Sequence, residues 1–378
     1  MNTLFGSART IGRFCSRTEI FCFTALWLIF LVVMGTLTEK DLGIFRAQQL
    51  YFSSFVLWLG FVPTPGGYTT MGTLFINLLA KLIFKSTWKA PKTGIYITHL
   101  GALLLLGGGF LTAAFSTEGF MVIPQGKALN FVSDYHKIEF AVSDSSSANL
   151  ESTVIFPEEA ITPGKTLRSQ RIPFQIDILQ VIKNVRITKR TTGSDQNNFH
   201  GFASLFEIQP GEEETEAERN HAGIVFKVSG TDSEKDGVYN IFDGMEITQT
   251  IRSKNKVFLV EIRRKRTYLP LAVELLSFAK ENYPGTSVAK NYKSIVSLID
   301  HSVSQRAVIQ LNEPVRTRGY TFYQSSYSER ADGVATVLAV VKNTGWIFPY
   351  VSSIIMCFGL LVHLLIQIPK LLPKTSQP

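Results

Sequence analysis

The stretch that decides the fold is residues 94–115, GIYITHLGALLLLGGGFLTAAF. It contains no Asp, Glu, Lys or Arg, and it reaches the length of about 20 residues that an α-helix needs to cross the hydrocarbon of a bilayer. Three consecutive glycines, Gly107, Gly108 and Gly109, let a neighbouring backbone approach closely. The stretch therefore predicts a membrane-spanning helix that packs tightly against a second helix.

Three more segments are apolar enough to be spans. Residues 20–37, IFCFTALWLIFLVVMGTL, form an uncharged run that is longer than the roughly 7–15 apolar residues of a signal peptide, which favours an uncleaved anchor. Residues 68–84 are the weakest candidate because they include Asn77 and Lys81, and residues 346–368 are the last. We expect four transmembrane helices in all.

Residues 50–62 are apolar but too short to span a bilayer, and Pro63 and Pro65 end the run. We expect an interfacial or re-entrant helix at this point. It would lie within an outer loop of residues 38–67, between the first and second spans.

Charge is unevenly distributed along the 378 residues. The chain is 45% hydrophobic and 18% charged, against roughly 25% charged residues in soluble proteins. Residues 116–345 carry 27 basic and 27 acidic side chains and are neutral, so the net charge of +8 lies entirely in the apolar flanks. A nucleic-acid-binding protein would concentrate its positive charge on a folded domain, and we exclude that class.

The basic residues of the flanks predict the orientation of the spans. They occupy a tail of residues 1–19, a turn of residues 85–93 and a tail of residues 369–378 (Arg9, Arg13 and Arg17; Lys85, Lys89 and Lys92; Lys370 and Lys374). The positive-inside rule places all three segments in the cytoplasm. Residues 116–345 are then exported as one large domain between the third and fourth spans, because long domains cross a membrane regardless of their own charge.

The exported domain is expected to be rich in β-strands. Segments rich in Val, Ile and Phe are separated by Gly, Pro, Asn and Asp, at residues 119–123, 172–187, 201–209, 223–228, 257–262, 307–312 and 334–341. Residues 271–281 are interpreted as a short helix, and the acidic residues 212–218 as a solvated loop. Residues 171–178 and 268–275 share a Pro followed by alternating apolar residues, which indicates two related β-units.

The residue types that carry covalent chemistry are sparse. The three cysteines, Cys15, Cys22 and Cys357, fall outside residues 116–345, so the exported domain has no disulfide. The sequence has no CxxC, CxxCH, phosphate-binding loop, nucleophile elbow or HExxH pattern. We expect no catalytic residue in this chain.

Two of the six histidines are functional candidates. The other four lie in the exported domain without ligand spacing, and we expect them to be surface or hydrogen-bonded loop residues (His136, His200, His221 and His301). His99 and His363 lie inside spans, where a titratable group is costly. Each is seven residues from a cytoplasmic lysine, or about 10 Å along its helix.

Two interpretations of His99 and His363 remain open from the residues alone. Neutral imidazoles at one depth could share a ligand or a metal, and an imidazole in an apolar pocket suits haem iron. Alternatively, each ring forms a hydrogen bond across helices and has a packing role only.

An ordered series of short motifs resembles the ResB-type proteins of cytochrome c biogenesis, also called CcsB-type. The series runs along almost the whole chain: Phe61-Val-Pro-Thr-Pro-Gly-Gly, Asn77-Leu-Leu-Ala, Thr98-His-Leu-Gly, Glu118-Gly-Phe-Met, Asn282-Tyr-Pro-Gly, Lys290-Asn-Tyr-Lys-Ser, Leu311-Asn-Glu-Pro and Gly319-Tyr-Thr-Phe-Tyr-Gln-Ser-Ser-Tyr. Residues 145–265 depart most from the family pattern.

The resemblance implies a subunit that passes haem b across the bacterial inner membrane and supports its covalent attachment to exported apocytochrome c. It implies a CcsA-type partner with a tryptophan-rich haem-handling motif, and a separate protein that reduces the apocytochrome thiols. His99 matches the family position of an axial haem ligand, whereas His363 is a weaker candidate for the same role. The exported domain would then be periplasmic.

Two other classes of function fit the same topology. A membrane-anchored sensor or scaffold would need a cytoplasmic signalling part, yet only ten residues follow Ile368. A transporter of another substrate would bind no haem, so its absorption spectrum would distinguish it.

Overall fold

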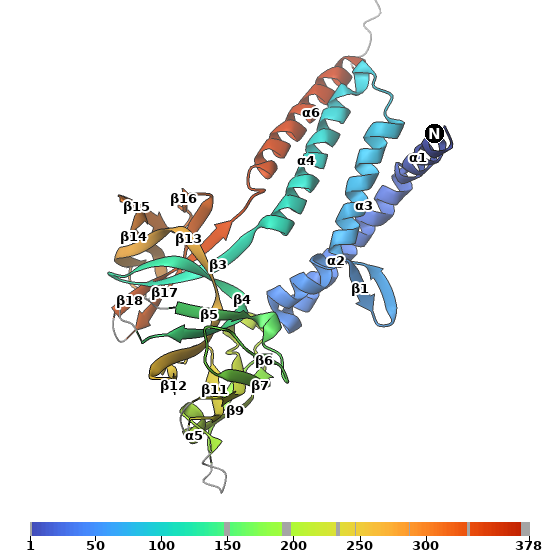
Figure 1. Cartoon of the computed structure of the whole chain (residues 1–378). Helices are drawn as coiled ribbons and strands as arrows, with labels where there is room; N and C mark the ends of the chain where they lie inside the picture. Colours follow the sequence, from blue (N-terminus) through green and yellow to red (C-terminus); the bar gives the residue numbers. More distant parts are fainter. Residues whose placement is uncertain are drawn as a thin grey trace, which may run out of the picture. The chain divides into compact units, whose positions relative to one another are not determined.

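The computed structural model describes residues 2–146, 152–190, 198–231, 235–245, 247–286, 288–330 and 333–371. The chain divides into two compact units (Figure 1). A helical unit contains Met1–Thr117 and Lys342–Pro378, and a β-unit contains Glu118–Val341. Lys374, expected in the cytoplasmic tail, lies outside the described residues.

Four helical stretches of the first unit are long and apolar enough to cross a membrane. They are Thr18–Phe52, Gly67–Lys85, Ala90–Phe115 and Phe348–Ile368. The helices themselves are α1 (Asn2–Cys15), α2 (Thr18–Ala47), α3 (Gly67–Ala80), α4 (Thr93–Phe115) and α6 (Phe348–Leu371), with short turns η1 (Gln48–Phe52), η2 (Lys81–Lys85) and η3 (Ala90–Lys92). The expected order, with a β-rich domain between the third and fourth apolar helices, is confirmed.

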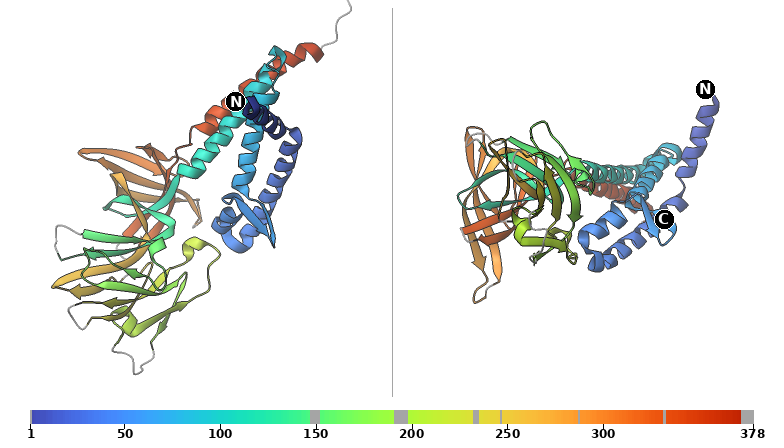
Figure 2. Two further views of the ribbon diagram at one scale, coloured as in Figure 1. Left: turned by 45° about the vertical axis from the view of Figure 1, so that its right-hand side comes forward. Right: turned by 60° about the horizontal axis from the view of Figure 1, so that its bottom comes forward.

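Glycine determines how α4 packs against α6. Gly94, Gly101 and Gly108 recur every seven residues and share one face of α4. A β-carbon added at any of them would overlap α6, which runs beside α4 in both views of Figure 2. Of the three consecutive glycines only Gly108 serves this contact, since nothing lies within 4 Å of a β-carbon built at Gly109.

This difference predicts the outcome of two matched substitutions. Gly108→Leu would overlap Phe348 of α6 and should lower the stability of the helical unit by about 1–3 kcal/mol, as overpacking does. Gly109→Leu should leave it nearly unchanged. Tryptophan fluorescence during thermal unfolding in detergent measures this, because all four tryptophans lie in the helical unit. Equal melting temperatures for the two variants would contradict the packing.

Asn77 joins the first two helices to α3. The helical conformation is interrupted at Ser16 and Arg17, between α1 and α2, and this leaves backbone carbonyl groups without partners inside a helix. The buried amide of Asn77 donates hydrogen bonds to the carbonyl oxygens of Cys15 at 2.6 Å and Arg17 at 2.8 Å. Asn77, one of the polar residues that made residues 68–84 the weakest candidate span, therefore satisfies carbonyl groups at the interruption between α1 and α2.

The expected interfacial or re-entrant helix at residues 50–62 is wrong. Beyond η1 the structure has a hairpin of β1 (Val56–Leu59) and β2 (Val62–Pro65). Gly60 adopts φ +64° at its turn, and the prolines of β2 cannot continue a helix. The indole of Trp27 in α2 donates a hydrogen bond to the Pro65 carbonyl at 2.8 Å, which holds the hairpin against α2.

The β-unit contains a rolled ten-stranded sheet, a four-stranded sheet and a two-stranded ribbon. The large sheet has the order β15-β14-β13-β4-β3-β18-β17-β16, with β12 and β5 added to β13 and β4. Its strands are β3 (Thr117–Pro124), β4 (Ala128–Asp144), β5 (Ser152–Pro157), β12 (Gln249–Ser253), β13 (Lys256–Asn282), β14 (Ala289–Asp300), β15 (Val303–Gln310), β16 (Val315–Thr317), β17 (Tyr320–Arg330) and β18 (Gly333–Lys342). The small sheet contains β6 (Thr166–Leu167), β7 (Gln175–Ile182), β10 (Gly223–Ser229) and β11 (Gly237–Phe242), and the ribbon contains β8 (Val185–Lys189) and β9 (Phe206–Pro210), which the short helix α5 (Phe202–Leu205) precedes.

Two hydrophobic cores lie within the β-unit, and β13 contributes to both. Its first part packs Phe258, Val260 and Ile262 against the four-stranded sheet. Its second part packs Leu269, Leu271, Val273 and Leu275 inside the rolled sheet. The helix expected at residues 271–281 is therefore wrong: apolar residues alternate here with the period of two that a strand requires, and this outweighs the helix propensity of Leu, Ala and Glu.

A buried ion pair marks the point where β13 changes its inward face. Inward residues are even-numbered up to Ile262 and odd-numbered from Leu269, and the pairing of β13 with β4 shifts register between Arg264 and Arg266. Arg263 is buried at this point and donates from Nε to Oε1 of Glu139 at 2.8 Å. The basic run of residues 263–266 is thus largely internal to the β-unit.

We expect Glu139→Gln to lower the free energy of unfolding of the β-unit by about 1–3 kcal/mol, because it removes the buried carboxylate that accepts from Nε of Arg263 and leaves the guanidinium with the partly exposed Glu261 as its carboxylate partner. Glu216→Gln removes an exposed pair with Arg219 and should cost at most about 1 kcal/mol. Hydrogen exchange along β4 and β13 in the full chain measures both. Unchanged exchange in Glu139→Gln would show that the pair is dispensable.

Candidate functional site

His99 is half-buried on α4, on a face that is turned away from α6. Thr98 lies next to Gly359 of α6, and one residue further the helix has turned by about 100°. Lys81, at the end of α3, is close enough for its ammonium group to act electrostatically on the His99 ring. Phe110 lies three turns along the same face and is 69% exposed. His99 therefore stands on an apolar surface with one positive charge nearby.

His363 lies inside the contact between α4 and α6. Its backbone is so close to Gly94 that a β-carbon there would overlap it. Its Nδ1 atom is buried and has no hydrogen-bond partner among the described residues. The ring therefore belongs to the packed interface of the two helices.

The structure does not bring the two imidazoles together. His363 is level with Gly94, five residues or roughly 7 Å along α4 from His99. His99 also projects from the side of α4 that faces away from α6, whereas the backbone of His363 lies on the side that contacts α6. The backbones of the two histidines therefore lie at different levels of α4 and on different sides of it, so each histidine is considered separately.

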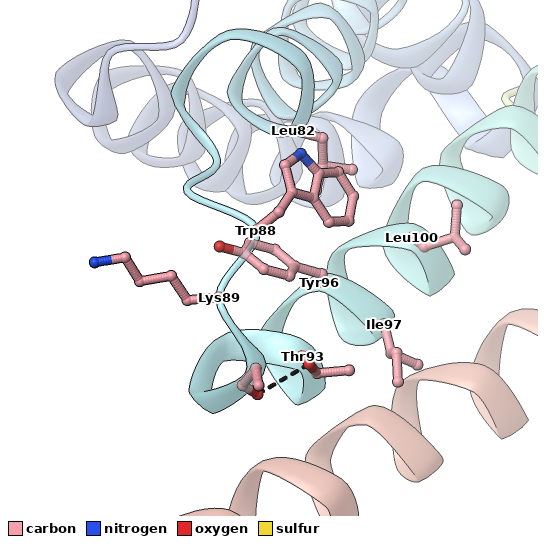
Figure 3. Close-up of a pocket in the computed structure, with 8 residues that line it drawn as sticks. Leu82, Trp88, Lys89, Thr93, Tyr96, Ile97 and Leu100 are labelled. Carbon is pink, nitrogen blue, oxygen red and sulfur yellow. Dashed lines mark hydrogen bonds between the residues drawn. The ribbon is translucent and has the colours of Figure 1, made fainter.

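A partly open pocket lies at the first turns of α4, and Leu100, the chain neighbour of His99, is among its lining residues. It encloses about 260 Å³ and is lined by Leu82, Trp88, Lys89, Ala90, Thr93, Tyr96, Ile97 and Leu100 (Figure 3). The rings of Trp88 and Tyr96 lie 4.7 Å apart and form one wall. His99 does not line the pocket. Sequence reasoning missed this pocket, although Trp88 between Lys85 and Lys89 is the aromatic signal that marks a membrane interface.

The C-terminal motifs form a polar cluster and an aromatic cluster in the β-unit. Ser294, Gln324 and Thr336, from three different strands, are buried and hydrogen-bonded to one another at 2.6–3.3 Å. The aromatic cluster contains Phe278, Tyr292 and Tyr327, whose rings lie 5.3–6.3 Å apart.

Lys280 extends the aromatic cluster with a positive charge. It donates a hydrogen bond to the Tyr327 hydroxyl at 2.8 Å, and this bond raises the pKa of Lys280. The short motifs therefore have structural roles inside and at the surface of the rolled sheet.

The remaining histidines behave mostly as expected. His200, His221 and His301 lie in loops or turns, and each ring is within hydrogen-bonding distance of an oxygen atom, at 3.1, 2.9 and 2.8 Å. His136 lies instead in β4, where burial lowers its pKa. The acidic residues 212–218 form a largely exposed loop, which confirms that expectation. Within the described ranges, no group of three His, Cys, Asp or Glu side chains is arranged to hold a metal ion.

Comparisons with known proteins agree with the motif series. Residues 221–335 match the ResB-like family. The chain is also 23% identical over 358 residues to Protein NrfI of Wolinella succinogenes, an alignment that covers 91% of this chain and 34% of that protein. The chain thus spans about a third of the length of this curated relative. The resemblance to ResB-type cytochrome c biogenesis proteins is confirmed by these two matches.

Proposed function

We propose that this chain is a membrane subunit of a cytochrome c biogenesis system, which passes haem across the membrane and supports its covalent attachment to exported apocytochrome c. The observation that carries the proposal is the match of residues 221–335 to the ResB-like family. In this proposal the chain acts as a haem-handling subunit. The bond-forming step belongs to the assembled complex.

The helical unit supports a location in the bacterial inner membrane. Large apolar side chains are exposed along several helices, including Phe23 at 72% and Ile354 at 69%. A soluble protein rarely exposes such continuous apolar surface, whereas lipid covers it at no cost. The basic residues of the 1–19 tail and the 85–93 turn support a cytoplasmic location for these segments and a periplasmic location for the β-unit.

The residues around His99 fit one side of a haem group. A neutral imidazole supplies an axial bond to haem iron, the apolar surface around it accepts a porphyrin face, and Lys81 carries the charge that a propionate prefers. Haem b bound here would supply the group to be delivered. In the helical unit His363 is the other histidine, and it is packed on a different side of α4. The second axial ligand would come from a partner.

If this chain handles haem and supplies one of its two axial ligands, the other steps of cytochrome c biogenesis require partner proteins. A CcsA-type protein with a tryptophan-rich motif would contribute the second histidine and the haem exit site. Apocytochrome c would meet the β-unit in the periplasm. Its thiols would be reduced by a separate protein, because none of the three cysteines of this chain lies in the β-unit.

The orientation can be tested with reporter fusions. We expect a reporter after Lys89 or at the C-terminus to remain cytoplasmic and a reporter at Gly211, in a loop of the β-unit, to be exported. Alkaline phosphatase activity reads the exported state, and a fluorescent protein that folds only in the cytoplasm reads the other. A cytoplasmic signal from the Gly211 fusion would overturn the four-span topology.

Replacing His99 tests haem binding. His99→Ala should leave membrane insertion intact, because a small apolar residue suits a helix rich in Gly and Ala. It should remove one iron bond, and so lower the haem absorbance of the purified complex and the yield of mature cytochrome c. Added imidazole should partly restore both.

His363→Ala is the matched control, since it removes the other histidine of these helices. The ring of His363 packs between α4 and α6, so its loss should reduce helix stability and leave haem absorbance per inserted protein unchanged. A full haem signal in well-inserted His99→Ala would remove His99 from the mechanism. An equal loss of haem in both variants would instead make His363 a ligand.

A further inference from the structure

The cytoplasmic end of the helical unit is uniformly basic around the pocket. No acidic residue occurs between Asp41 and Glu118. Four lysines lie in the same interval, in η2, in the following turn and at the end of η3 (Lys81, Lys85, Lys89 and Lys92). Such a segment attracts anions and presents no carboxylate of its own to neutralise the attraction.

The pocket has the positive charge of Lys89 at its edge and an elongated apolar wall. Thr93, Ile97 and Leu100 follow one side of α4 over two turns, which is roughly 10 Å. Leu82 and Trp88 form the facing wall in Figure 3, and Lys89 stands at the edge with its ammonium group pointing outward. The shape and lining suit a hydrocarbon chain whose charged end remains at the edge.

Two polar features at this end have no side-chain partner among the described residues. No side chain caps the N-terminus of α4, where the helix dipole favours an anion. The Tyr96 hydroxyl is buried in the pocket wall, and no described residue is hydrogen-bonded to it. An ester or phosphate oxygen entering the pocket would satisfy such a donor.

We propose that this pocket binds one anionic phospholipid of the cytoplasmic leaflet, with an acyl chain along α4 and the phosphate at Lys89 and the α4 N-terminus. The proposal rests on the proposed membrane location and is independent of haem transfer. The pocket of about 260 Å³ is open on one side, so it can hold part of an acyl chain while the rest of the lipid remains in the bilayer. The bound lipid would fix the turn between α3 and α4 beside His99.

The test uses the full chain in nanodiscs of equal parts phosphatidylglycerol and phosphatidylcholine, followed by native mass spectrometry of the released protein. Carbonate extraction first establishes that the protein is inserted, so a failure of insertion is distinguished from a failure of lipid binding. We expect one phosphatidylglycerol to remain bound to the wild-type chain. Excess glycerol phosphate should not displace it, because the acyl chain contributes most of the binding.

Two variants and one control separate the contribution of charge to lipid binding from that of the shape of the pocket. Lys89→Ala should lower the preference for phosphatidylglycerol over phosphatidylcholine about fivefold. Ala90→Trp should fill the pocket and abolish retention of both lipids. Lys127→Ala, at an exposed position of the β-unit, should change nothing.

Three results would overturn the proposal. Equal retention of the two lipids by the wild-type chain would remove the charge preference. Displacement by glycerol phosphate would indicate a phosphate site without an acyl chain. Loss of haem absorbance in Ala90→Trp with unchanged lipid retention would assign the pocket to haem.

Discussion

The contact between α4 and α6 is the constraint on which the rest of the chain depends. These two helices are separated in sequence by the whole β-unit, and only glycine on the contact face of α4 lets them lie together. At one end of the pair, Asn343 accepts hydrogen bonds from the hydroxyl groups of Thr112 and Ser116, each at 3.1 Å. The strands that continue from the pair, β3 and β18, are neighbours in the rolled sheet. The chain therefore enters and leaves the rolled sheet through neighbouring strands.

The same contact determines which histidine is available. Because α6 covers the glycine face of α4, the backbone of His363 lies in that contact, whereas His99 lies on the side of α4 that faces away from α6. Tight packing on one side of a helix thus leaves the other side for a ligand or a partner. Lys81 and the pocket both lie on this end of α3 and α4, so the charged and apolar features that surround His99 come from consecutive segments of the chain.

The sequence predicted those features that depend on composition over a long window. Four apolar helices and a neutral β-rich domain follow from runs of uncharged residues and from counted charges, which no tertiary contact changes. The hairpin at Val56–Pro65 was missed because its apolar run shows no clear period, and packing against α2 decided its form. Residues 271–281 were missed because helix propensity was weighed above a short alternation. The pocket and the neighbourhood of Lys81 could not be predicted, since they need the distance between α3 and α4.

Strand β13 restricts which insertions and deletions this protein can accept during evolution. Its 27 residues serve two cores in succession, with the inward face reversed once between them. Inserting or deleting one residue between Ile262 and Leu269 would turn every later apolar side chain of the strand outward. Length variation among descendants of this chain should then accumulate in segments such as the acidic loop at residues 212–218, while the spacing between the two halves of β13 stays constant. The number of residues between the two halves of β13 is therefore more strongly constrained than the identity of those residues.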